Sequence, residues 1–260
     1  MSIVTFTTDF GQGDYYLPLI KGSILSQNGQ LQLIDITHQI KNYDIVQAAF
    51  IFKNAWRSFP PGTIHLISVN DFYQETCRYL AIQHEGHYFI GPDNGVFTLI
   101  FGDAKIVGYA LDAPDGSVFS LHQVYARAIG HIAAGEKEFG KIGQPVEALV
   151  QRITFQPVVQ HSSIRGSIIH IDRFQNVILN IDRKLFDRIG NGREFQLFFK
   201  RHDPITQLSQ HYHDVPVGEV LCLFNSAGYL EIAINMGRAA ELLGMQVEDT
   251  VQVEFNTIPG

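Results

Sequence analysis

The sequence is poor in cysteine and has no long hydrophobic run. Its 260 residues include two cysteines, Cys77 and Cys222, which make no disulfide framework and fit the reduced thiols of a cytoplasmic protein. No apolar run approaches the roughly 18 residues that a membrane-spanning helix needs, and no apolar segment precedes a cleavage site near the N-terminus. We therefore expect a soluble, cytoplasmic protein with no membrane partner.

Positive charge is also scarce. The chain has 19 Lys and Arg residues against 26 Asp and Glu residues, a net charge of -7, and no block of like charge. This balance argues against a nucleic acid or a membrane surface as partner and favours a small-molecule ligand. Hydrophobic residues, by contrast, make up 45% of the chain, which is enough for the core of one large domain or of two smaller ones.

The first half of the chain alternates between strand and helix patterns. A run rich in β-branched residues begins near Ile3, and the pattern then predicts two helices and two further strands, the last of which ends at Asp71. Pro18 falls in the first turn of the first helix, where proline is tolerated. This order predicts an α/β domain with a mainly parallel central sheet. The elements expected further on are a hairpin turn at 85–87, a tight turn at 93–95 and a helix at 124–135.

Helical periodicity nearly vanishes after about residue 150. Short alternating strands with polar turns fill the rest of the chain, and only residues 237–244 show a helical pattern. The second half is therefore predicted to be an all-β, barrel-like domain. We place the α/β domain at 1–150, the C-terminal barrel-like domain at 163–260 and the linker at about 150–163.

Acidic side chains follow two of the predicted strands. Asp9 and Asp14 come after the first strand and Asp71 after the third, and ligands of open α/β sheets bind beyond the carboxyl ends of the parallel strands. A carboxylate bridges two vicinal hydroxyls and disfavours phosphate, so this edge suits a sugar or a cation. The GQG stretch lacks the G-x-G-x-x-G spacing of a pyrophosphate site. Arg78 lies seven residues after Asp71, and His122 comes just before the helix predicted at 124–135.

Each of these residues also has a structural interpretation, which the sequence leaves open. Asp9 and Asp14 would serve equally as caps of the first helix. Asp71 and Arg78 would form an ion pair within a loop, and His122 would be a surface or capping histidine.

Other polar stretches carry weaker signals. His211 and His213 share one face of a strand, but no third ligand stands nearby, so we predict no metal site. The turns at 172–176 and 225–228 are explained by turn chemistry alone. No G-x-S-x-G nucleophile motif stands out.

Six stretches taken together resemble one family across nearly the whole chain. The family is the adenosine-forming S-adenosylmethionine (SAM) hydrolases, also called SAM hydroxide adenosyltransferases, which are relatives of the fluorinase and the chlorinase. Any one stretch alone is a weak signal, whereas six in order at matching spacing are a strong one. The stretches are residues 7–22, 33–40, 60–71, 91–95, 171–181 and 224–244.

The resemblance implies both an architecture and a reaction. Members of the family have an N-terminal α/β domain and a C-terminal barrel-like domain, and are typically homotrimers whose active sites lie between the N-terminal domain of one subunit and the C-terminal domain of the next. The implied reaction is attack of water at C5′ of the ribose, which converts SAM to adenosine and L-methionine. SAM is the substrate, and no cofactor or metal is required.

The resemblance also assigns roles to individual residues. The catalytic set of the family falls on Asp71, Arg78 and His122, and its ribose-binding acid falls on Asp9. The remaining positions implied to bind substrate are Asp14, Asp172 and Ser226 at the methionine end, Phe174 and Asn176 at the adenine, and Glu231 with the backbone near Ile234 as further adenosine contacts.

Two loops depart from the family pattern. Family members have the pattern V-D-P-G-V-G-[ST]-x-R where this chain has NDFYQETCR. They have F-H-G-R-D where this chain has LHQVY, and this second segment is two residues shorter here. The side chains survive while the backbone that presents them has changed, so a protein that binds adenosine or SAM with little turnover is one alternative. A SAM-dependent halogenase is another, although its relatives lack the Asp71 and His122 combination. A third is the same fold with another nucleoside as ligand.

Overall fold

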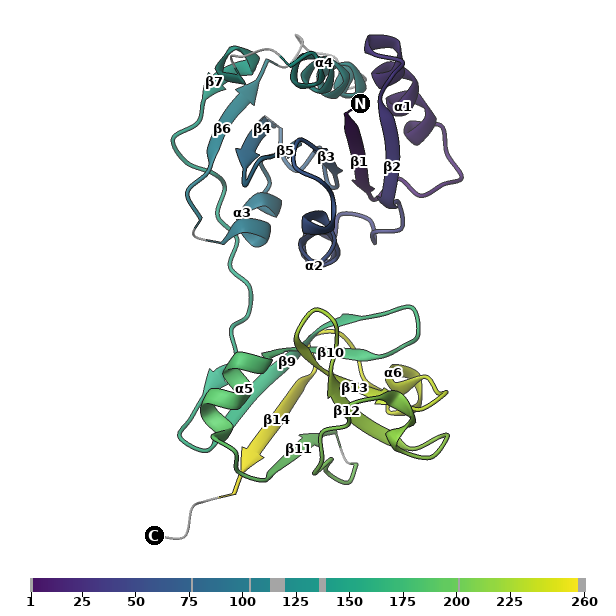
Figure 1. The fold of residues 1–260 in the computed structure, drawn as a ribbon, viewed down its shortest axis with the longest axis vertical. Coiled ribbons are helices and arrows are strands. Elements are labelled where there is room, and N and C mark those ends of the chain that lie inside the picture. Colours follow the sequence, from purple (N-terminus) through teal and green to yellow (C-terminus); the bar gives the residue numbers. More distant parts are fainter. Residues whose placement is uncertain are drawn as a thin grey trace. The chain divides into compact units, whose positions relative to one another are not determined.

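The protein is represented by a computed structural model that describes residues 2–75, 77–102, 104–112, 120–135, 139–200 and 202–256. The chain divides into two compact units, Met1–Ile153 and Thr154–Gly260 (Figure 1). Each unit has its own sheet and its own hydrophobic core. None of the helices in the described ranges combines the length and apolarity needed to cross a membrane.

The first unit is built on a seven-stranded mixed sheet. Its strand order is β2-β1-β3-β5-β4-β6-β7. The pairs that join β2, β1, β3 and β5 are parallel, and those that join β5, β4, β6 and β7 are antiparallel. The strands are β1 (Ile3–Thr8), β2 (Gln32–Thr37), β3 (Ile64–Ser68), β4 (Tyr79–His84), β5 (His87–Pro92), β6 (Val107–Leu111) and β7 (Gly143–Pro145).

The prediction of a mainly parallel sheet is corrected to a mixed one, and the β4–β5 hairpin is the reason. Glu85 and Gly86 have φ angles of 47° and 77°, the left-handed pair that a two-residue hairpin turn requires. This confirms the hairpin expected at 85–87. The turn reverses the chain inside the sheet, so β4 runs against β5 and β6 in turn runs against β4.

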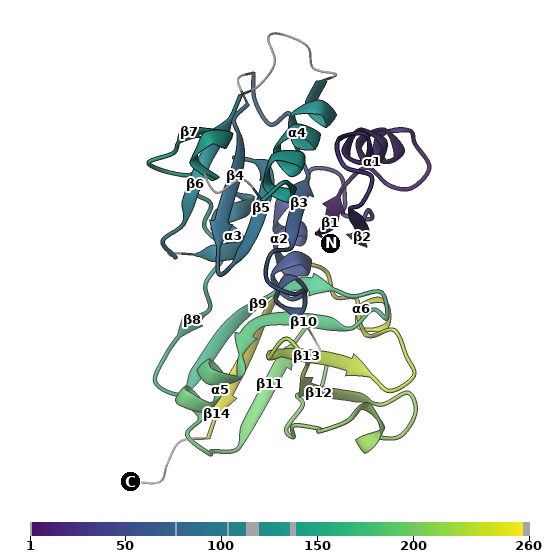
Figure 2. The same cartoon turned by 45° about the horizontal axis from the view of Figure 1, so that its top comes forward.

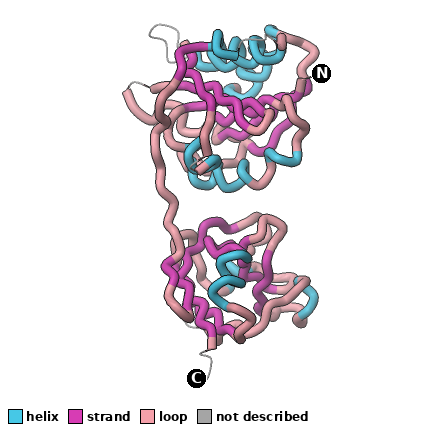
Figure 3. Tube along the Cα trace, turned by 60° about the vertical axis from the view of Figure 1, so that its left-hand side comes forward, coloured by secondary structure: helices cyan, strands magenta, loops and turns pink. Residues whose placement is uncertain are grey.

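Helices cover both faces of this sheet (Figures 1 and 3). On one face, α1 and α4 enclose a core that includes Val4 and Phe6 of β1. On the other face, α2 and α3 enclose a core around Phe52 and Phe89. The short α3 was not expected, since six residues are too few to show a helical period. The helices are α1 (Tyr16–Gln27), α2 (Ile45–Lys53), α3 (Val96–Phe101) and α4 (Leu121–Ala133), with 3₁₀ turns at Trp56–Ser58 and Phe139–Ile142.

The second unit contains an antiparallel sheet that curls on itself (Figure 2). Its strand order is β11-β14-β9-β10-β13-β12, with β8 added beside β9, and the curl encloses one apolar core that includes Leu179, Leu197 and Ile232. The strands are β8 (Val158–Val159), β9 (Ser163–Ile171), β10 (Val177–Asp182), β11 (Phe195–Phe199), β12 (Val220–Phe224), β13 (Tyr229–Ile234) and β14 (Thr250–Phe255).

This unit is not all-β, which corrects the prediction. Besides α6 (Ala239–Leu242) and a 3₁₀ turn at Tyr212–Asp214, it has α5 (Arg183–Gly190). The side chain of Asp182 accepts a hydrogen bond from the backbone N–H of Leu185 at 2.7 Å, and Asn191 ends the helix in the left-handed conformation. Aspartate is common at the start of a helix and asparagine just after its end. The sequence therefore contained the signals for both ends of α5, but the helix is too short to show a helical period.

Candidate functional site

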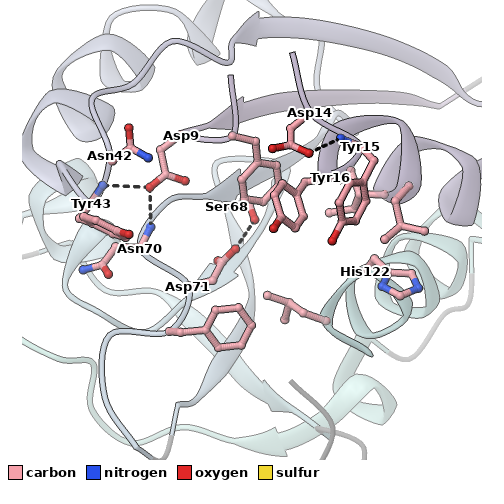
Figure 4. Close-up of a pocket in the computed structure, with 15 residues that line it drawn as sticks. Asp9, Asp14, Tyr15, Tyr16, Asn42, Tyr43, Ser68, Asn70, Asp71 and His122 are labelled. Atoms are coloured by element: carbon pink, nitrogen blue, oxygen red, sulfur yellow. Dashed lines mark hydrogen bonds between the residues drawn. The ribbon is translucent and has the colours of Figure 1, made fainter. Parts of the chain in front are cut away.

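A cavity of about 480 Å³ opens in the first unit at the carboxyl ends of β1 and β3 (Figure 4). Because β2, β1 and β3 run parallel, the loops that follow them meet at one edge of the sheet. Four of the residues implied to bind or transform substrate line this cavity: Asp9, Asp14, Asp71 and His122. In Figure 4, Asp9 lies at one end of the group and His122 at the other, with Asp71 between them.

Asp9 ties the three loops together. Its Oδ2 accepts hydrogen bonds from the backbone N–H of Tyr43 at 2.9 Å and of Asn70 at 3.2 Å. Tyr43 and Asn70 have φ angles of 69° and 52°, a conformation that costs energy outside glycine and is retained where the surroundings hold it. The alternative in which Asp9 caps the first helix is therefore wrong, since its carboxylate bonds the loops after β2 and β3.

Asp71 is buried at the centre of the cavity wall, with 6% of its surface exposed. Its Oδ2 accepts a hydrogen bond from Ser68 Oγ at 2.5 Å, and its Oδ1 accepts one from Tyr125 Oη at 2.8 Å. Burial raises the pKa of Asp71 to about 7; the two hydrogen bonds oppose this rise and the charge of Asp9 adds to it. A carboxyl group that titrates near neutral pH suits general acid–base chemistry.

Arg78 takes a different partner from the one that the sequence suggested. Its Nε donates to Oδ2 of Asp93 at 2.7 Å, its Nη2 also bonds Asp93, and Nη2 donates to the carbonyl of Ala148 at 2.8 Å. The antiparallel register that pairs Tyr79 with Pro92 brings Arg78 opposite Asp93. The expected pairing of Arg78 with Asp71, as a catalytic pair or as a loop ion pair, is therefore corrected, while a catalytic role for Arg78 stays a prediction.

Asp14 is exposed and His122 is half-buried at the cavity. Asp14 lies before α1, and its Oδ1 accepts from the N–H of Tyr15 at 2.9 Å. The first helix has no side-chain cap, so the capping alternative is wrong for Asp14 as well. His122 stands in the first turn of α4, where its side chain reaches the cavity.

Sequence reasoning missed three residues that support Asp71. Ser68 and Tyr125 donate to its carboxylate, and Asn94 Nδ2 donates to the carbonyls of Val69 and Asn70 at 2.9 and 3.1 Å. The turn at 93–95 therefore holds the loop that presents Asp71. Asn94 could have been noticed because it follows β5 at the same edge of the sheet, whereas Tyr125 gives no signal beyond an apolar position in a helix.

A second polar cluster lies within the C-terminal unit. The Oδ1 of Asp172 accepts from the N–H of Asn176 at 2.8 Å. Glu231, only 2% exposed, accepts from Tyr212 Oη at 2.8 Å and from Asn225 Nδ2 at 3.1 Å. Burial raises the pKa of Glu231, and the charge of Asp172 raises it further. Asp172, Asn176 and Glu231 are therefore neighbours, while their roles in substrate binding stay predictions.

The other three predicted positions of this unit differ in exposure. Phe174, in the turn between β9 and β10, is 76% exposed and presents its ring to solvent, and Ser226 is also exposed. Ile234 is buried at the end of β13, and its carbonyl accepts from the N–H of Gly237 at 2.9 Å. Ile234 therefore offers backbone rather than side chain near this surface.

The sequence matches both domains of one family. Residues 4–143 match the SAM hydroxide adenosyltransferase N-terminal domain, and residues 166–252 match the SAM hydroxide adenosyltransferase C-terminal domain. The chain belongs to the SAM hydroxide adenosyltransferase family. This confirms the resemblance carried by the six stretches.

Similar proteins align with this chain over nearly its full length. A protein named (R)-S-adenosyl-L-methionine hydrolase from Methanocaldococcus jannaschii is 28% identical, over 98% of this chain and 97% of its own. A fluorinase from Nocardia brasiliensis is 24% identical, over 97% of this chain and 96% of its own. The crystal structure of an uncharacterized conserved protein from Thermotoga maritima superposes with a TM-score of 0.85 at 25% identity, covering 97% of this chain and 99% of that one.

The cavity of this SAM hydroxide adenosyltransferase family member is acidic. It brings together Asp9, Asp14 and Asp71, and among its described lining residues there is no lysine or arginine. Such a wall attracts a cation and repels a phosphate. Within the described ranges, no group of three or more His, Cys, Asp or Glu side chains is arranged to hold a metal ion, and the stacked rings of His211 and His213, 5.1 Å apart, remain a pair.

Proposed function

We propose that this protein hydrolyses SAM to adenosine and L-methionine. The observation that carries the proposal is the buried Asp71, whose pKa is about 7, in an acidic cavity at the carboxyl edge of the sheet. SAM is a cation with two ribose hydroxyls, which is the chemistry that such a wall attracts. Family membership and the hydrolase relatives support the same reaction.

The difficult step of this reaction is activation of water. The sulfonium leaves as a neutral thioether and needs no acid, whereas water is a poor nucleophile. In its ionised form Asp71 accepts the proton of the attacking water as the C5′–O bond forms, and the electrons of the C5′–S bond pass to sulfur. The proton is then released from Asp71 to solvent.

The charges of the transition state favour a dry site. The hydroxide-like character of the water and the positive charge of the sulfonium cancel as the reaction proceeds, so removal of solvent lowers the barrier. Placing the water in line with the breaking bond lowers the barrier further, by roughly 7 kcal/mol in well-oriented systems. His122, at the same cavity, stabilises the developing hydroxide.

The remaining predicted residues hold the substrate in this proposal. Asp9 bridges the ribose hydroxyls, and Asp14 faces the ammonium at the methionine end. Asp172 and Ser226 complete the methionine end, Phe174 and Asn176 contact adenine, and Glu231 with the backbone near Ile234 contacts adenosine. We further propose a cytoplasmic homotrimer that needs no cofactor, in which SAM lies between the N-terminal unit of one subunit and the C-terminal unit of the next.

Product analysis tests the proposal. Incubation of the purified protein with SAM should yield adenosine and methionine in equal amounts by chromatography, and Asp71→Asn should reduce turnover by at least about 100-fold. Adenosine affinity, measured by calorimetry, should change far less in that variant. If ample protein forms no more adenosine than a heat-killed control, hydrolysis is ruled out.

One observation favours a second candidate, a SAM- or adenosine-binding protein with little turnover. Arg78 is engaged by Asp93 and Ala148, so it does not serve Asp71 in this structure. Calorimetric binding of SAM without product would support this candidate. The same assay with added chloride or fluoride addresses a halogenase, which would form a 5′-halo-adenosine in place of adenosine, and a thermal-shift screen of nucleosides addresses another ligand.

A further inference from the structure

The carboxylate of Asp71 is clamped between two hydroxyl groups. Tyr125, fully buried in α4, donates to Oδ1, and Ser68, buried at the end of β3, donates to Oδ2. The two donors come from a helix and a strand on either side of the acid, 54 and 3 positions away in sequence. Both oxygens of Asp71 thus have a partner that restricts rotation of the carboxylate.

Among the described residues that line the cavity with Asp71 there is no lysine or arginine. Asp9, Asp14 and His122 line the same cavity, and the charge of Asp9 raises the pKa of Asp71. On β4, Tyr79 donates from Oη to the backbone carbonyl of Asp71 at 3.4 Å, and Cys77 lies beside Tyr79.

The nearest arginine in sequence does not pair with Asp71 either. The guanidinium of Arg78 bonds Asp93. A buried carboxylate without a neighbouring cation depends on hydrogen-bond donors to remain ionised.

We propose that Tyr125 and Ser68 are positioning residues for Asp71, which aim its carboxylate at the cavity and keep it ionised in place of an arginine. This rests on the proposed function of Asp71 as the group that accepts the proton of water. A hydrogen bond to the charged form of an acid stabilises that form, so the hydroxyls favour the protein state that is ready to react. In this proposal both hydroxyls act through the carboxylate of Asp71.

The variant Tyr125→Phe tests the proposal because it removes one hydroxyl and keeps the ring. Loss of one charge-assisted hydrogen bond should raise the pKa of Asp71 by about one to two units. The acid limb of kcat/KM against pH should move up by the same amount, so activity falls about tenfold or more on that limb. At pH 9 it should stay within about threefold of the wild type. Ser68→Ala should shift the limb in the same direction.

Tyr79→Phe is the matched control. Tyr79 is a buried tyrosine whose ring packs edge-on against Tyr125 with centroids 5.8 Å apart, and its hydroxyl bonds the backbone of Asp71 and not the carboxylate. The limb should stay where it is in this variant. An equal loss of activity at every pH in Tyr125→Phe, with no shift of the limb, would mean that Tyr125 is only structural and would overturn the proposal.

A titration without substrate separates this inference from the proposed function. Carbon-13 NMR of the labelled aspartate carboxyl groups, assigned with Asp71→Asn, reports the pKa of Asp71 directly. Tyr125→Phe should raise that pKa and Tyr79→Phe should not, whether or not SAM is the substrate. An unchanged pKa in Tyr125→Phe would refute the clamp, and a wild type that forms no adenosine would refute the hydrolase alone.

Discussion

Arg78 donates a hydrogen bond of 2.7 Å from Nε to the Oδ2 of Asp93, a carboxylate that is only 1% exposed. The other oxygen of Asp93 accepts from the backbone N–H of Val150 at 3.0 Å, and Arg78 also reaches the carbonyl of Ala148. The pair therefore fastens the end of the 70–78 loop to β5 and to the segment that closes the first unit.

Arg78→Ala should destabilise the protein. Asp93 would lose its cation while remaining buried. We expect this to lower the free energy of unfolding by about 1–3 kcal/mol, which is less than for a fully buried ion pair because the Arg78 side chain is partly exposed. Arg238→Ala is the control, because Arg238 pairs with Glu241 on the surface and such pairs contribute at most about 1 kcal/mol. Urea unfolding measures both. Equal small losses would show that the Arg78–Asp93 pair is not structural.

Asp9→Asn should weaken ligand binding more than it weakens the fold. The amide oxygen of asparagine can still accept from the N–H groups of Tyr43 and Asn70, but the charge is lost. We expect adenosine affinity to fall about tenfold or more, the value of one charge-assisted hydrogen bond, with little change in melting temperature. Asp9→Ala removes the acceptor as well and should lower both. Unchanged affinity in Asp9→Asn would remove Asp9 from the binding site.

Asn94→Ala should disturb Asp71 without touching it. The carbonyls of Val69 and Asn70 lose their donor, so the loop that presents Asp71 loosens. We expect kcat to fall about tenfold or more and the free energy of unfolding to fall by about 1–3 kcal/mol. Asn54→Ala, which removes a side-chain bond to the carbonyl of Phe50 on an exposed helix end, should leave kcat unchanged. A normal kcat in Asn94→Ala would contradict the prediction.

His65 should make stability depend on pH. It is fully buried in β3, bonded to Thr5 Oγ1 at 2.7 Å and to His87 Nδ1 at 3.1 Å. Burial lowers the pKa of His65 to about 3, so between its ordinary value of about 6.5 and 3 the unfolded chain binds the extra proton. The contribution of His65 to the free energy of unfolding is therefore constant above pH 6.5 and declines as pH falls below it.

The comparison of the wild type with His65→Gln isolates this effect. Between pH 7.5 and pH 5, the wild type should lose about 2 kcal/mol more than the variant. Burial raises the pKa of Asp71 to about 7, so the contribution of Asp71 to stability increases as pH falls. Asp71 is present in both proteins, and its contribution cancels in the comparison. Identical pH dependence in the two proteins would show that folding does not lower the pKa of His65.

Several features of the fold followed directly from local sequence patterns. The strand at Ile3, the hairpin turn at Glu85 and Gly86 and the helix predicted at 124–135 are present in the structure, although the helix runs over Leu121–Ala133 and so includes His122. Each of these features depends on residues near one another in the chain. The short helices α3 and α5 were missed, since six and eight residues hold too few turns for a helical period to be seen.

The sequence by itself determined the family, the two-unit order and the presence of acids at the ends of parallel strands, because these depend on residue type and spacing. Only the tertiary structure decided which partner each side chain meets. The β4–β5 register places Arg78 opposite Asp93, so these two side chains form the ion pair. The packing of α4 on the sheet brings the hydroxyl of Tyr125 to Asp71, 54 positions away in the sequence. Periodicity shows that a residue is buried, but the atom that it bonds is set by how distant elements pack.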